Sequence, residues 1–327
     1  MPGPHSTTEI VFAAYDGIQG LDLVGPWEVF HGANGVLDST EARGPRYSLT
    51  VVSTDGRSIV TESGLSMATQ PAARQRVHTL VIPGGFGARA AATDPTLVAT
   101  IRALASRSQR IVTVCSGTFV AAAAGLADGK RVTTHWARAH SLQRDFPDVV
   151  VDPEPIYCRD GKLWSSAGVT AGIDLALAIV EDDHSAEVAQ VVARWLVMFL
   201  RRPGGQSQFA TPVWTERAEQ APVRQAQDLI DAEPAADLRI GRLAARVGMS
   251  ERHFMRCFAA EIGTSPAQYI AGVRVEAARR ALESTTDTVD AIAGRCGFGT
   301  AETMRRTFTR RIGVSPDQYR QRFRSTP

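Results

Sequence analysis

The 327 residues of this chain are enough for two or three domains of about 100–200 residues each. Hydrophobic residues make up 44% and charged residues 21%, which excludes a largely disordered chain. The formal net charge of +2 does not by itself indicate a nucleic-acid partner. Residues 1–224 carry 20 basic and 22 acidic side chains, whereas residues 225–327 carry 16 and 12, so the C-terminal part is mildly basic, which is consistent with DNA contact.

The cysteines and the apolar patterning indicate the cellular compartment. The four cysteines, Cys115, Cys158, Cys257 and Cys296, are far apart and lack the spacing of metal ligands. The N-terminus lacks the basic-then-apolar pattern of a signal peptide, and no apolar run reaches 18 residues. We therefore expect a cytoplasmic protein with free thiols, without a bound metal, a cofactor or membrane contact.

The first two hundred residues alternate between strand-like and helix-like segments. Apolar strand-like segments are residues 10–14, 47–52, 79–82 and 111–114. Helix-like segments are residues 27–30 after Gly25-Pro26, 95–107 and 116–126, and residues 164–172 resemble a strand that turns into a small-residue helix. This alternation predicts a doubly wound α/β domain with a parallel sheet, whose ligands bind at the carboxyl ends of the strands.

Cys115 stands between an apolar strand and an alanine-rich helix, in the segment Val112-Thr-Val-Cys115-Ser116-Gly117. This context is typical of a nucleophile elbow, although the usual glycine two residues before the nucleophile is missing. A helix N-terminus lowers the pKa of a thiol, so the position predicts a reactive cysteine in a pocket. The alternative is a small buried cysteine that packs under the turn.

Four motifs together resemble the PfpI/ThiJ superfamily, a branch of the class I glutamine amidotransferase-like fold. They are Leu21-Asp22-Leu-Val-Gly25-Pro26, Pro83-Gly84-Gly85, Cys115-Ser116-Gly117 and Thr133-Thr134-His135-Trp136. The resemblance covers about residues 8–200 and implies a flavodoxin-like domain. Isonitrile hydratases of this superfamily use an aspartate that matches Asp22 and a cysteine that matches Cys115.

The same resemblance implies a site and also marks a departure from the family. Proteases and chaperone-like members follow the cysteine with histidine, and the hydratases follow it with threonine, whereas this chain has Ser116. His135 matches a histidine that approaches the cysteine in some members. The amides of Gly85 and Ser116 would form an anion pocket. The implied effector site comprises Asp22, Gly84, Gly85, Cys115, Ser116 and His135, of which Cys115, Asp22 and His135 are the candidate catalytic residues.

Residues 203–222 are rich in proline, glycine, glutamine and serine, which predicts a connection between domains. We place the N-terminal domain at residues 1–202, the linker at 203–224 and a second domain at 225–327. The segment from Arg194 to Phe209, which contains Arg201-Arg202-Pro203-Gly204-Gly205, is typical of regulators that join an amidotransferase-like domain to a DNA-binding domain.

The second domain contains an internal repeat with a period of fifty residues. Phe258, Ile262, Gly263, Ser265, Pro266, Gln268 and Tyr269 recur as Phe308, Ile312, Gly313, Ser315, Pro316, Gln318 and Tyr319. Upstream, the segment from Leu243 to Gly248 is similar to the segment from Ile292 to Gly297. A match of this length in constant register indicates a duplicated structural unit.

Each copy has the pattern of helix, tight turn, helix. Gly248 and Gly297 stand where the first helix must end, and Ser250 and either Gly299 or Thr300 can begin the second helix. Phe254, Cys257 and Phe258 in one copy, and Met304 and Phe308 in the other, form the apolar face of that second helix. The opposite faces carry Arg252, Met255 and Arg256 in the first copy and Glu302, Thr303, Arg305 and Arg306 in the second. Ser265-Pro266 and Ser315-Pro316 would each begin a further helix.

Residues 225–327 resemble the DNA-binding domain of the AraC/XylS family, most specifically from Gly297-Phe298 to Tyr319-Arg320. The resemblance implies an all-α domain of seven helices with two helix-turn-helix units that enter adjacent major grooves of double-stranded DNA. It also implies a homodimer that contacts RNA polymerase. The arginines on the second helix of each unit can form bidentate hydrogen bonds with guanine, and Glu302 can accept a hydrogen bond from cytosine. Alternatively, the arginines bind only phosphate groups.

Three functions of the N-terminal domain remain open at this point. The first is a sensor, in which a small-molecule effector occupies the former catalytic site of a sequence-specific transcription regulator. The second is an enzyme that retains Cys115-dependent hydratase or amidase activity. The third is a redox sensor based on Cys115. The combination with an AraC-type domain favours the first, a regulator that is not an enzyme.

Overall fold

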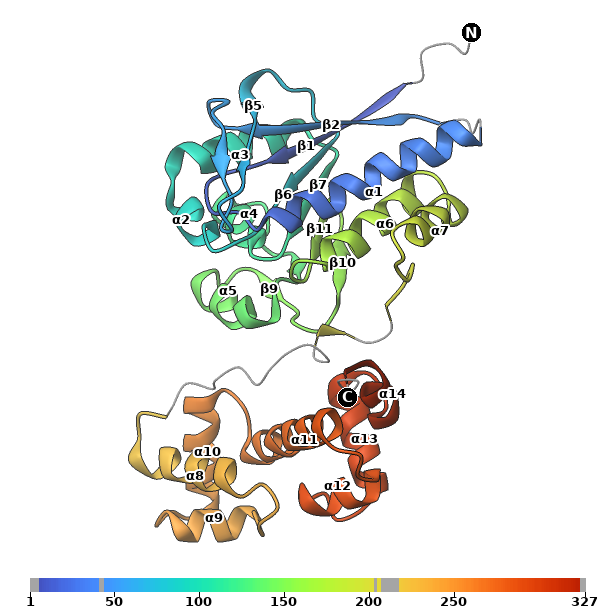
Figure 1. Cartoon of the computed structure of the whole chain (residues 1–327). Coiled ribbons are helices and arrows are strands. Elements are labelled where there is room, and N and C mark those ends of the chain that lie inside the picture. Colours follow the sequence, from blue (N-terminus) through green and yellow to red (C-terminus); the bar gives the residue numbers. More distant parts are fainter. Residues whose placement is uncertain (1–5, 41–43, 203–204, 207–217, 324–327) are drawn as a thin grey trace. The chain divides into compact units, whose positions relative to one another are not determined.

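The computed structural model describes residues 6–40, 44–202, 205–206 and 218–323 (Figure 1). The chain forms two compact units, residues 1–202 and residues 203–327. Most of the expected linker, residues 203–204 and 207–217, lies outside the described residues. Helix α8 (Ala221–Ala232) begins four residues before the boundary expected at residue 225, because Pro222 fits the first helical turn, where no N–H partner is needed.

A seven-stranded sheet forms the centre of the N-terminal unit, with the order β10-β11-β7-β6-β1-β2-β5. Neighbouring strands are parallel except for the antiparallel pair β10 and β11. The strands are β1 (Thr7–Ala13), β2 (Arg46–Ser53), β5 (Gln70–Pro71), β6 (Thr79–Ile82), β7 (Arg110–Val114), β10 (Tyr157–Asp160) and β11 (Leu163–Ser166). Two short pairs lie outside this sheet: β3 (Ile59–Val60) with β4 (Ser66–Met67), and β8 (Arg131–Val132) with β9 (Val150–Val151).

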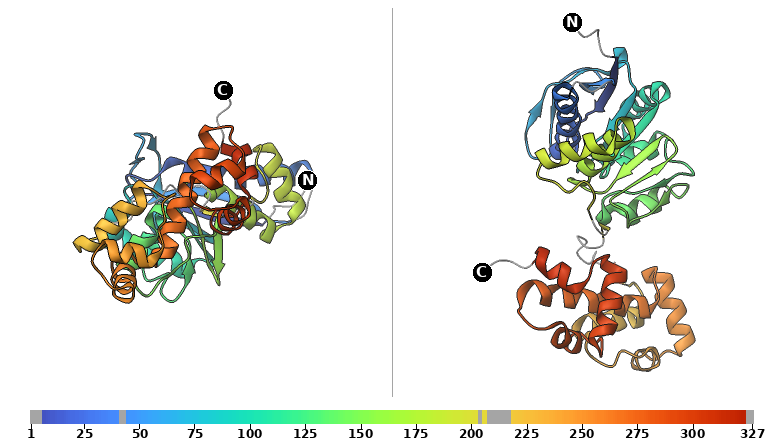
Figure 2. Two further views of the ribbon diagram at one scale, coloured as in Figure 1. Left: turned by 90° about the horizontal axis from the view of Figure 1, so that it is seen from below. Right: turned by 90° about the vertical axis from the view of Figure 1, so that its right-hand side faces the viewer.

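Helices cover both faces of this sheet, as Figures 1 and 2 show. One group packs together as α1 (Gly20–Ser39), α6 (Ala171–Asp183) and α7 (Ala186–Trp195), and another as α2 (Ala88–Thr93), α3 (Pro95–Arg107) and α4 (Gly117–Ala123). Helix α5 (Ala139–Asp145) lies beside β9. The strands β6, β7 and β11 are buried along their whole length because they are covered on both faces. The doubly wound α/β fold expected from the sequence is confirmed.

Two expected helix boundaries are wrong. Helix α1 begins at Gly20 and contains Gly25-Pro26, so these residues do not precede the helix. Pro26 removes one bond of the helical ladder, and α1 nevertheless continues because Gly25 and Pro26 pack closely against α6. Helix α4 ends at Ala123 rather than near residue 126, because the chain turns at Gly125 with a positive φ of 71°.

Seven helices lie among the described residues of the C-terminal unit. They are α8, α9 (Ile240–Arg246), α10 (Glu251–Ile262), α11 (Pro266–Ser284), α12 (Val289–Arg295), α13 (Ala301–Ile312) and α14 (Pro316–Phe323). Each copy of the repeat has its own core: Phe254 and Phe258 are fully buried in the first, and Met304 and Phe308 in the second. The all-α domain expected from the sequence is therefore confirmed.

The local signals of the repeat act as the sequence predicts. Gly248 and Gly297 adopt positive φ angles of 70° and 78°. The side chains of Ser250 and Thr300 accept hydrogen bonds from the third residue of α10 and α13 respectively. Ser265 and Gln268 form a reciprocal capping box at the start of α11, which joins the two copies.

Packing between the two copies distinguishes their turn glycines. A Cβ added at Gly297 would lie 2.6 Å from the Pro234 carbonyl oxygen, whereas one added at Gly248 would meet nothing within 4 Å. We expect Gly248→Ala to lower the free energy of unfolding by about 1 kcal/mol, the strain of a left-handed alanine. Gly297→Ala should lower the free energy of unfolding at least about twice as much, because the loop after α8 must also move. Urea denaturation measures both losses. Equal losses would contradict this packing.

Candidate nucleic-acid interface and the Cys115 site

The second helices of the two helix-turn-helix units expose the side chains expected to meet DNA. Arg252, Met255 and Arg256 are exposed on α10, and Glu302, Arg305 and Arg306 are exposed on α13. Thr303 differs from the expectation, because it is half-buried and its hydroxyl accepts a hydrogen bond from Thr300. The exposed residues of each set point away from the buried core residues of their helix, so they are not needed to hold the core together.

Two exposed residues on these helices were not anticipated from the sequence. His253 lies in the first turn of α10, 3.1 Å from Arg256 through Nδ1 and a guanidinium nitrogen. Arg310 is exposed in the last turn of α13. The signal for His253 was its place directly after Arg252, at the start of the second helix of the unit, where helix-turn-helix proteins contact bases.

Contacts across α11 hold the two helix-turn-helix units together. Arg274 of α11 donates from Nε to the Pro234 carbonyl at 2.8 Å and from Nη2 to the Ala236 carbonyl at 3.2 Å. The same loop packs against Gly297, in the turn of the second unit. Arg311 of α13 also donates to the Gln268 carbonyl in α11. The spacing of the exposed faces of α10 and α13 is therefore set by these contacts as well as by the length of α11.

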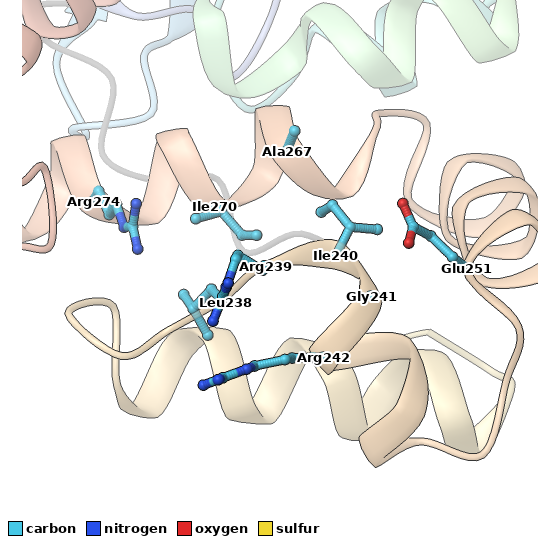
Figure 3. A pocket seen from close by; sticks show the side chains of 9 residues that line it. All are labelled: Leu238, Arg239, Ile240, Gly241, Arg242, Glu251, Ala267, Ile270 and Arg274. Carbon is cyan, nitrogen blue, oxygen red and sulfur yellow. The ribbon is translucent and has the colours of Figure 1, made fainter.

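A groove of about 810 Å³ lies beside the first helix-turn-helix unit (Figure 3). Its charged lining residues are Arg239, Arg242, Arg274 and Glu251. Arg239 and Arg242 both pair with Asp237, at 2.6 and 2.7 Å, and the hydrogen bonds of Arg239 lower the Asp237 pKa to about 2. Because Arg274 is also engaged, as described above, the groove offers little unsatisfied charge to a small ligand.

Cys115 lies in the turn between β7 and α4, as the sequence predicts. Its φ of 56° is a left-handed conformation that costs a non-glycine residue energy, and such strain is typical of a nucleophile elbow. Hydrogen bonds hold this turn in place. The Cys115 N–H donates to the carbonyls of Ser166 and Ala167, and Thr134 Oγ1 donates to the Cys115 carbonyl at 2.7 Å. The Cys115 side chain is buried.

Asp22 and Cys115 are brought together, although they are 93 positions apart. Asp22 is fully buried in the first turn of α1, and its Oδ2 accepts from the Gly84 N–H at 2.9 Å. Its Oδ1 accepts no hydrogen bond of normal geometry from a described residue, although the Cys115 thiol and the Val169 N–H face the carboxylate and oppose the rise of its pKa. Burial raises the Asp22 pKa to about 7, with Gly84 opposing the shift and Glu62 adding to it.

The expected low pKa of the Cys115 thiol is wrong. Burial, and secondly the nearby Asp22 carboxylate, raise the Cys115 pKa to about 12. The backbone amides of Ser116 and Val169 oppose this shift but do not reverse it. A helix N-terminus lowers a thiol pKa only when desolvation does not outweigh it, and here desolvation dominates.

The thiol should therefore react slowly. We expect iodoacetamide at pH 7.5 to alkylate Cys115 at least about tenfold more slowly than Cys257, because the thiolate is the reactive form and Cys257 is more exposed. Peptide mass spectrometry over a time course measures both rates in one sample. Faster labelling of Cys115 would show that its surroundings stabilise the thiolate.

The remaining expected site residues are placed less favourably for catalysis. His135 is half-buried, its ring packs against Gly168, and its pKa is lowered by burial and by Arg138. Its Nδ1 accepts from the Ala137 N–H, and no hydrogen bond to Cys115 occurs among the described residues. The Gly85 amide is not free for an anion, because it donates to Ser116 Oγ at 2.9 Å.

The tight backbone packing explains why glycines occupy this turn. A Cβ at Gly84 would lie 2.5 Å from the Ser116 nitrogen, and one at Gly85 would lie 2.4 Å from the Gln19 nitrogen. Gly84 and Gly85 are therefore required for the approach of the β6 loop to α1 and α4.

Two further residues of this site were not predicted from the sequence. Val169 has a φ of 50°. Tyr15 is buried, and its pKa is raised by burial, Asp22 and Cys115.

A separate cleft of about 640 Å³ lies at the carboxyl ends of β1 and β2. It includes none of the expected effector residues. Its polar side chains are engaged within the chain: Asp16 accepts from the Val60 N–H, Ser53 donates to the Arg57 carbonyl, and Asp94 caps α3.

Comparisons with known proteins agree with this arrangement. A family model described as "Helix-turn-helix domain" matches residues 243–322, and one described as "DJ-1/PfpI family" matches residues 8–182. The HTH-type transcriptional regulator Rv1931c of Mycobacterium tuberculosis is 37% identical over 275 residues, which cover 76% of this chain and 96% of that protein. The isonitrile hydratase of Pseudomonas putida is 31% identical over 186 residues, or 56% of this chain and 75% of the hydratase.

A solved structure supports the fold of the N-terminal unit. A ThiJ/PfpI family protein from Pseudomonas syringae matches with a TM-score of 0.52 and 25% identity, over 70% of this chain and 88% of that chain. None of the helices in the described parts of the chain has the length and apolar composition needed to cross a membrane. The chain belongs to the AraC-type helix-turn-helix transcriptional regulators that carry an N-terminal DJ-1/PfpI domain, and it is a DNA-binding transcription regulator.

Proposed function

We propose that this regulator reads two adjacent major-groove sites on one face of its operator and is controlled by a small-molecule effector bound in its N-terminal unit. One observation carries the DNA-binding part of the proposal: each helix-turn-helix unit presents a polar, arginine-bearing face on its second helix while the opposite face fills a core. The contacts of Arg274 and Arg311 across α11 support a fixed spacing between the two faces.

The recognition residues divide by chemistry. The guanidinium groups of Arg252, Arg256, Arg305 and Arg306 suit guanine or phosphate, and Glu302 suits the amino group of cytosine. Met255 offers an apolar contact to a thymine methyl group. Thr303, which helps to cap α13, is placed to support the helix start and to approach the DNA backbone.

Hydroxyl-radical footprinting on the operator tests this arrangement. The operator is first selected from fragments that flank the gene. We expect two protected regions on one face of the duplex, about one helical turn or 10 base pairs apart, for each protein chain. A single protected region for each chain, or protection on opposite faces, would contradict the proposed use of both units.

The effector site proposed here lies at Asp22 and Cys115, with Gly84, Gly85, Ser116 and His135 around them. The buried Asp22 carboxylate supports this placement, because its Oδ1 accepts no hydrogen bond of normal geometry within the described part of the chain and can accept one from a ligand. Metabolites handled by the genes next to the operator are the compounds to test, by fluorescence anisotropy of operator DNA. Cys115→Ala and Asp22→Ala should each shift the half-effective concentration at least about tenfold, and an unchanged value in both would place the site elsewhere.

An enzyme function of the N-terminal unit is the second candidate. The adjacency of Asp22 and Cys115 favours it, and a relative is named isonitrile hydratase. Hydration would convert an isonitrile and water to an N-substituted formamide. We expect no turnover, because the Cys115 thiol is almost entirely protonated at neutral pH. Formamide production that disappears in Cys115→Ala would establish the enzyme function.

We further propose that the regulator is a cytoplasmic homodimer that contacts RNA polymerase. Exposed apolar side chains at the end of α7 and directly after it, namely Trp195, Val197 and Phe199, support self-association, because such a patch is costly on a monomer. Light scattering at micromolar concentration should give twice the mass of the 35.2 kDa chain. A mass of one chain would contradict the dimer.

A further inference from the structure

The last residues of the N-terminal unit are fixed to α6 by two neighbouring arginines that have very different surroundings. Arg202 contacts both carboxylate oxygens of Asp174 at 2.8 Å, and its Nη2 donates to the Thr170 carbonyl at 3.2 Å. The Asp174 side chain is 3% exposed and that of Arg202 is 21% exposed. Arg201 pairs with Glu181 at 2.8 Å, but its side chain is 73% exposed. Arg202 is therefore part of a largely buried pair, and Arg201 is not.

The carbonyl that Arg202 contacts ends the loop from Ser166 to Thr170, which we call the Val169 loop. The other end of this loop is bound to the Cys115 turn, because the Cys115 N–H donates to the carbonyls of Ser166 and Ala167 at 3.2 and 3.1 Å. In the middle, Gly168 packs so closely on His135 that an added Cβ would lie 2.0 Å from the ring. The loop thus contacts the Cys115 turn at one end, His135 in the middle and Arg202 at the other end.

The backbone of this loop is strained. Val169 is a β-branched residue with a φ of 50°, and Cys115 has a φ of 56°. Such conformations persist only where neighbouring contacts hold them in place. Arg202 and the Cys115 turn supply contacts of this kind from the two ends. A shift at the Cys115 turn would consequently change the contacts available to Arg202.

Arg202 is also the last residue of the N-terminal unit before the chain continues to the DNA-binding unit. We propose that Arg202 is a positioning residue that couples the Val169 loop, and through it the Cys115 turn, to the DNA-binding unit. This inference rests on the proposed function, in which the Cys115 turn belongs to the effector site. Its pairing with Asp174 fixes where the chain leaves the N-terminal unit, and a change in the loop moves that exit point.

Coupling between two sites is reciprocal, which allows a test without a known effector. If the Cys115 turn and the DNA-binding unit are coupled, operator DNA must change the surroundings of Cys115. The probe is iodoacetamide, and the readout is the ratio of Cys115 alkylation rates with and without saturating operator, measured by peptide mass spectrometry on the full chain. In the wild type we expect operator DNA to raise or lower the Cys115 alkylation rate by a factor of at least about three.

Three variants at Arg202 and one control variant separate coupling from a merely structural role. Arg202→Ala should bring the ratio close to one, whereas the matched control Arg201→Ala should keep the wild-type ratio. Because Arg202→Ala leaves the Asp174 carboxylate buried without its partner and can unfold the unit, the double variant Arg202→Gln/Asp174→Asn replaces the ion pair with two neutral amides. It should fold and also give a ratio close to one. Arg202→Lys, which keeps one charged contact, should partly restore the ratio.

The outcomes distinguish this inference from the proposed function. Operator affinity is measured for each variant in the same experiment. A ratio of one in the wild type, or the wild-type ratio retained in Arg202→Ala and in Arg202→Gln/Asp174→Asn, would overturn the coupling while leaving operator binding intact. Failure of every chain to bind the operator in preference to random DNA would instead overturn the proposed function, and the coupling with it.

Discussion

Asp22→Asn is expected to make the N-terminal unit more stable at pH 8 by about 4 kcal/mol and to remove the part of its pH dependence between pH 4 and pH 7 that comes from Asp22. The Asp22 pKa is raised from 3.8 to about 7, chiefly by burial. Each unit of pKa shift corresponds to about 1.4 kcal/mol, so a shift of about three units gives this order of magnitude. Asparagine has nearly the same shape as the protonated acid and cannot ionise.

Proton linkage determines whether stability rises or falls with pH. The folded state holds the Asp22 proton more tightly than the unfolded chain does, so its stabilising effect is complete below about pH 4. This effect is lost as the pH rises towards 7, because the unfolded chain ionises at lower pH than the folded protein. Wild type should therefore lose stability over this range from Asp22 alone, and the asparagine variant should not.

Urea denaturation of the N-terminal unit at pH 4.5, 6 and 8 measures this effect. The matched control is Glu28→Gln, which removes an exposed carboxylate from the same helix. This control should follow the wild-type pH dependence. If Asp22→Asn were less stable than wild type at pH 8, Asp22 would be a favourably ionised group and the account of its burial would be wrong.

Arg256→Ala combined with Arg306→Ala is expected to weaken operator binding by about 2–6 kcal/mol, or roughly 30-fold to 10⁴-fold. Each arginine contributes about 1–3 kcal/mol if it contacts a base edge. The two residues lie on different helices, α10 and α13, with separate cores, so their effects should be nearly additive. Neither side chain supports a core, so the variant should fold normally.

Comparison with random DNA identifies the kind of contact that is lost. A base-reading arginine affects the operator more than random DNA, whereas a phosphate contact affects both to the same extent. Arg107→Ala, which removes one positive charge from an exposed site in the N-terminal unit, is the control and should bind like wild type. If the double variant bound the operator within about twofold of the wild-type affinity, the assignment of α10 and α13 as recognition helices would be wrong.

The repeat and the fold class followed from the sequence because both depend on local signals. Glycines at Gly248 and Gly297, the caps at Ser250 and Thr300, and Ser265-Pro266 act within a few residues, and the structure has each of them where it was expected. The positions of β6, β7 and α3 followed in the same way from apolar runs and helical spacing.

The properties of the Cys115 site did not follow, because they depend on contacts between distant segments. The sequence placed Cys115 at a helix N-terminus and so predicted a low pKa, but it did not show that burial and Asp22 raise that pKa. It identified Gly85 as a free amide, whereas Ser116 occupies it. No local pattern marks the left-handed conformation of Val169 or the contact between Arg202 and the Thr170 carbonyl.

A salt titration of DNA binding tests whether this protein recognises its operator by sequence. Affinities of the full chain for an operator fragment and for random DNA of equal length are compared between 50 and 300 mM salt, for example. We expect a preference for the operator of at least about 10³-fold that persists as both affinities fall with salt, because base contacts add to phosphate contacts. Equal affinities with the same salt slope for both DNAs would contradict a sequence-specific regulator.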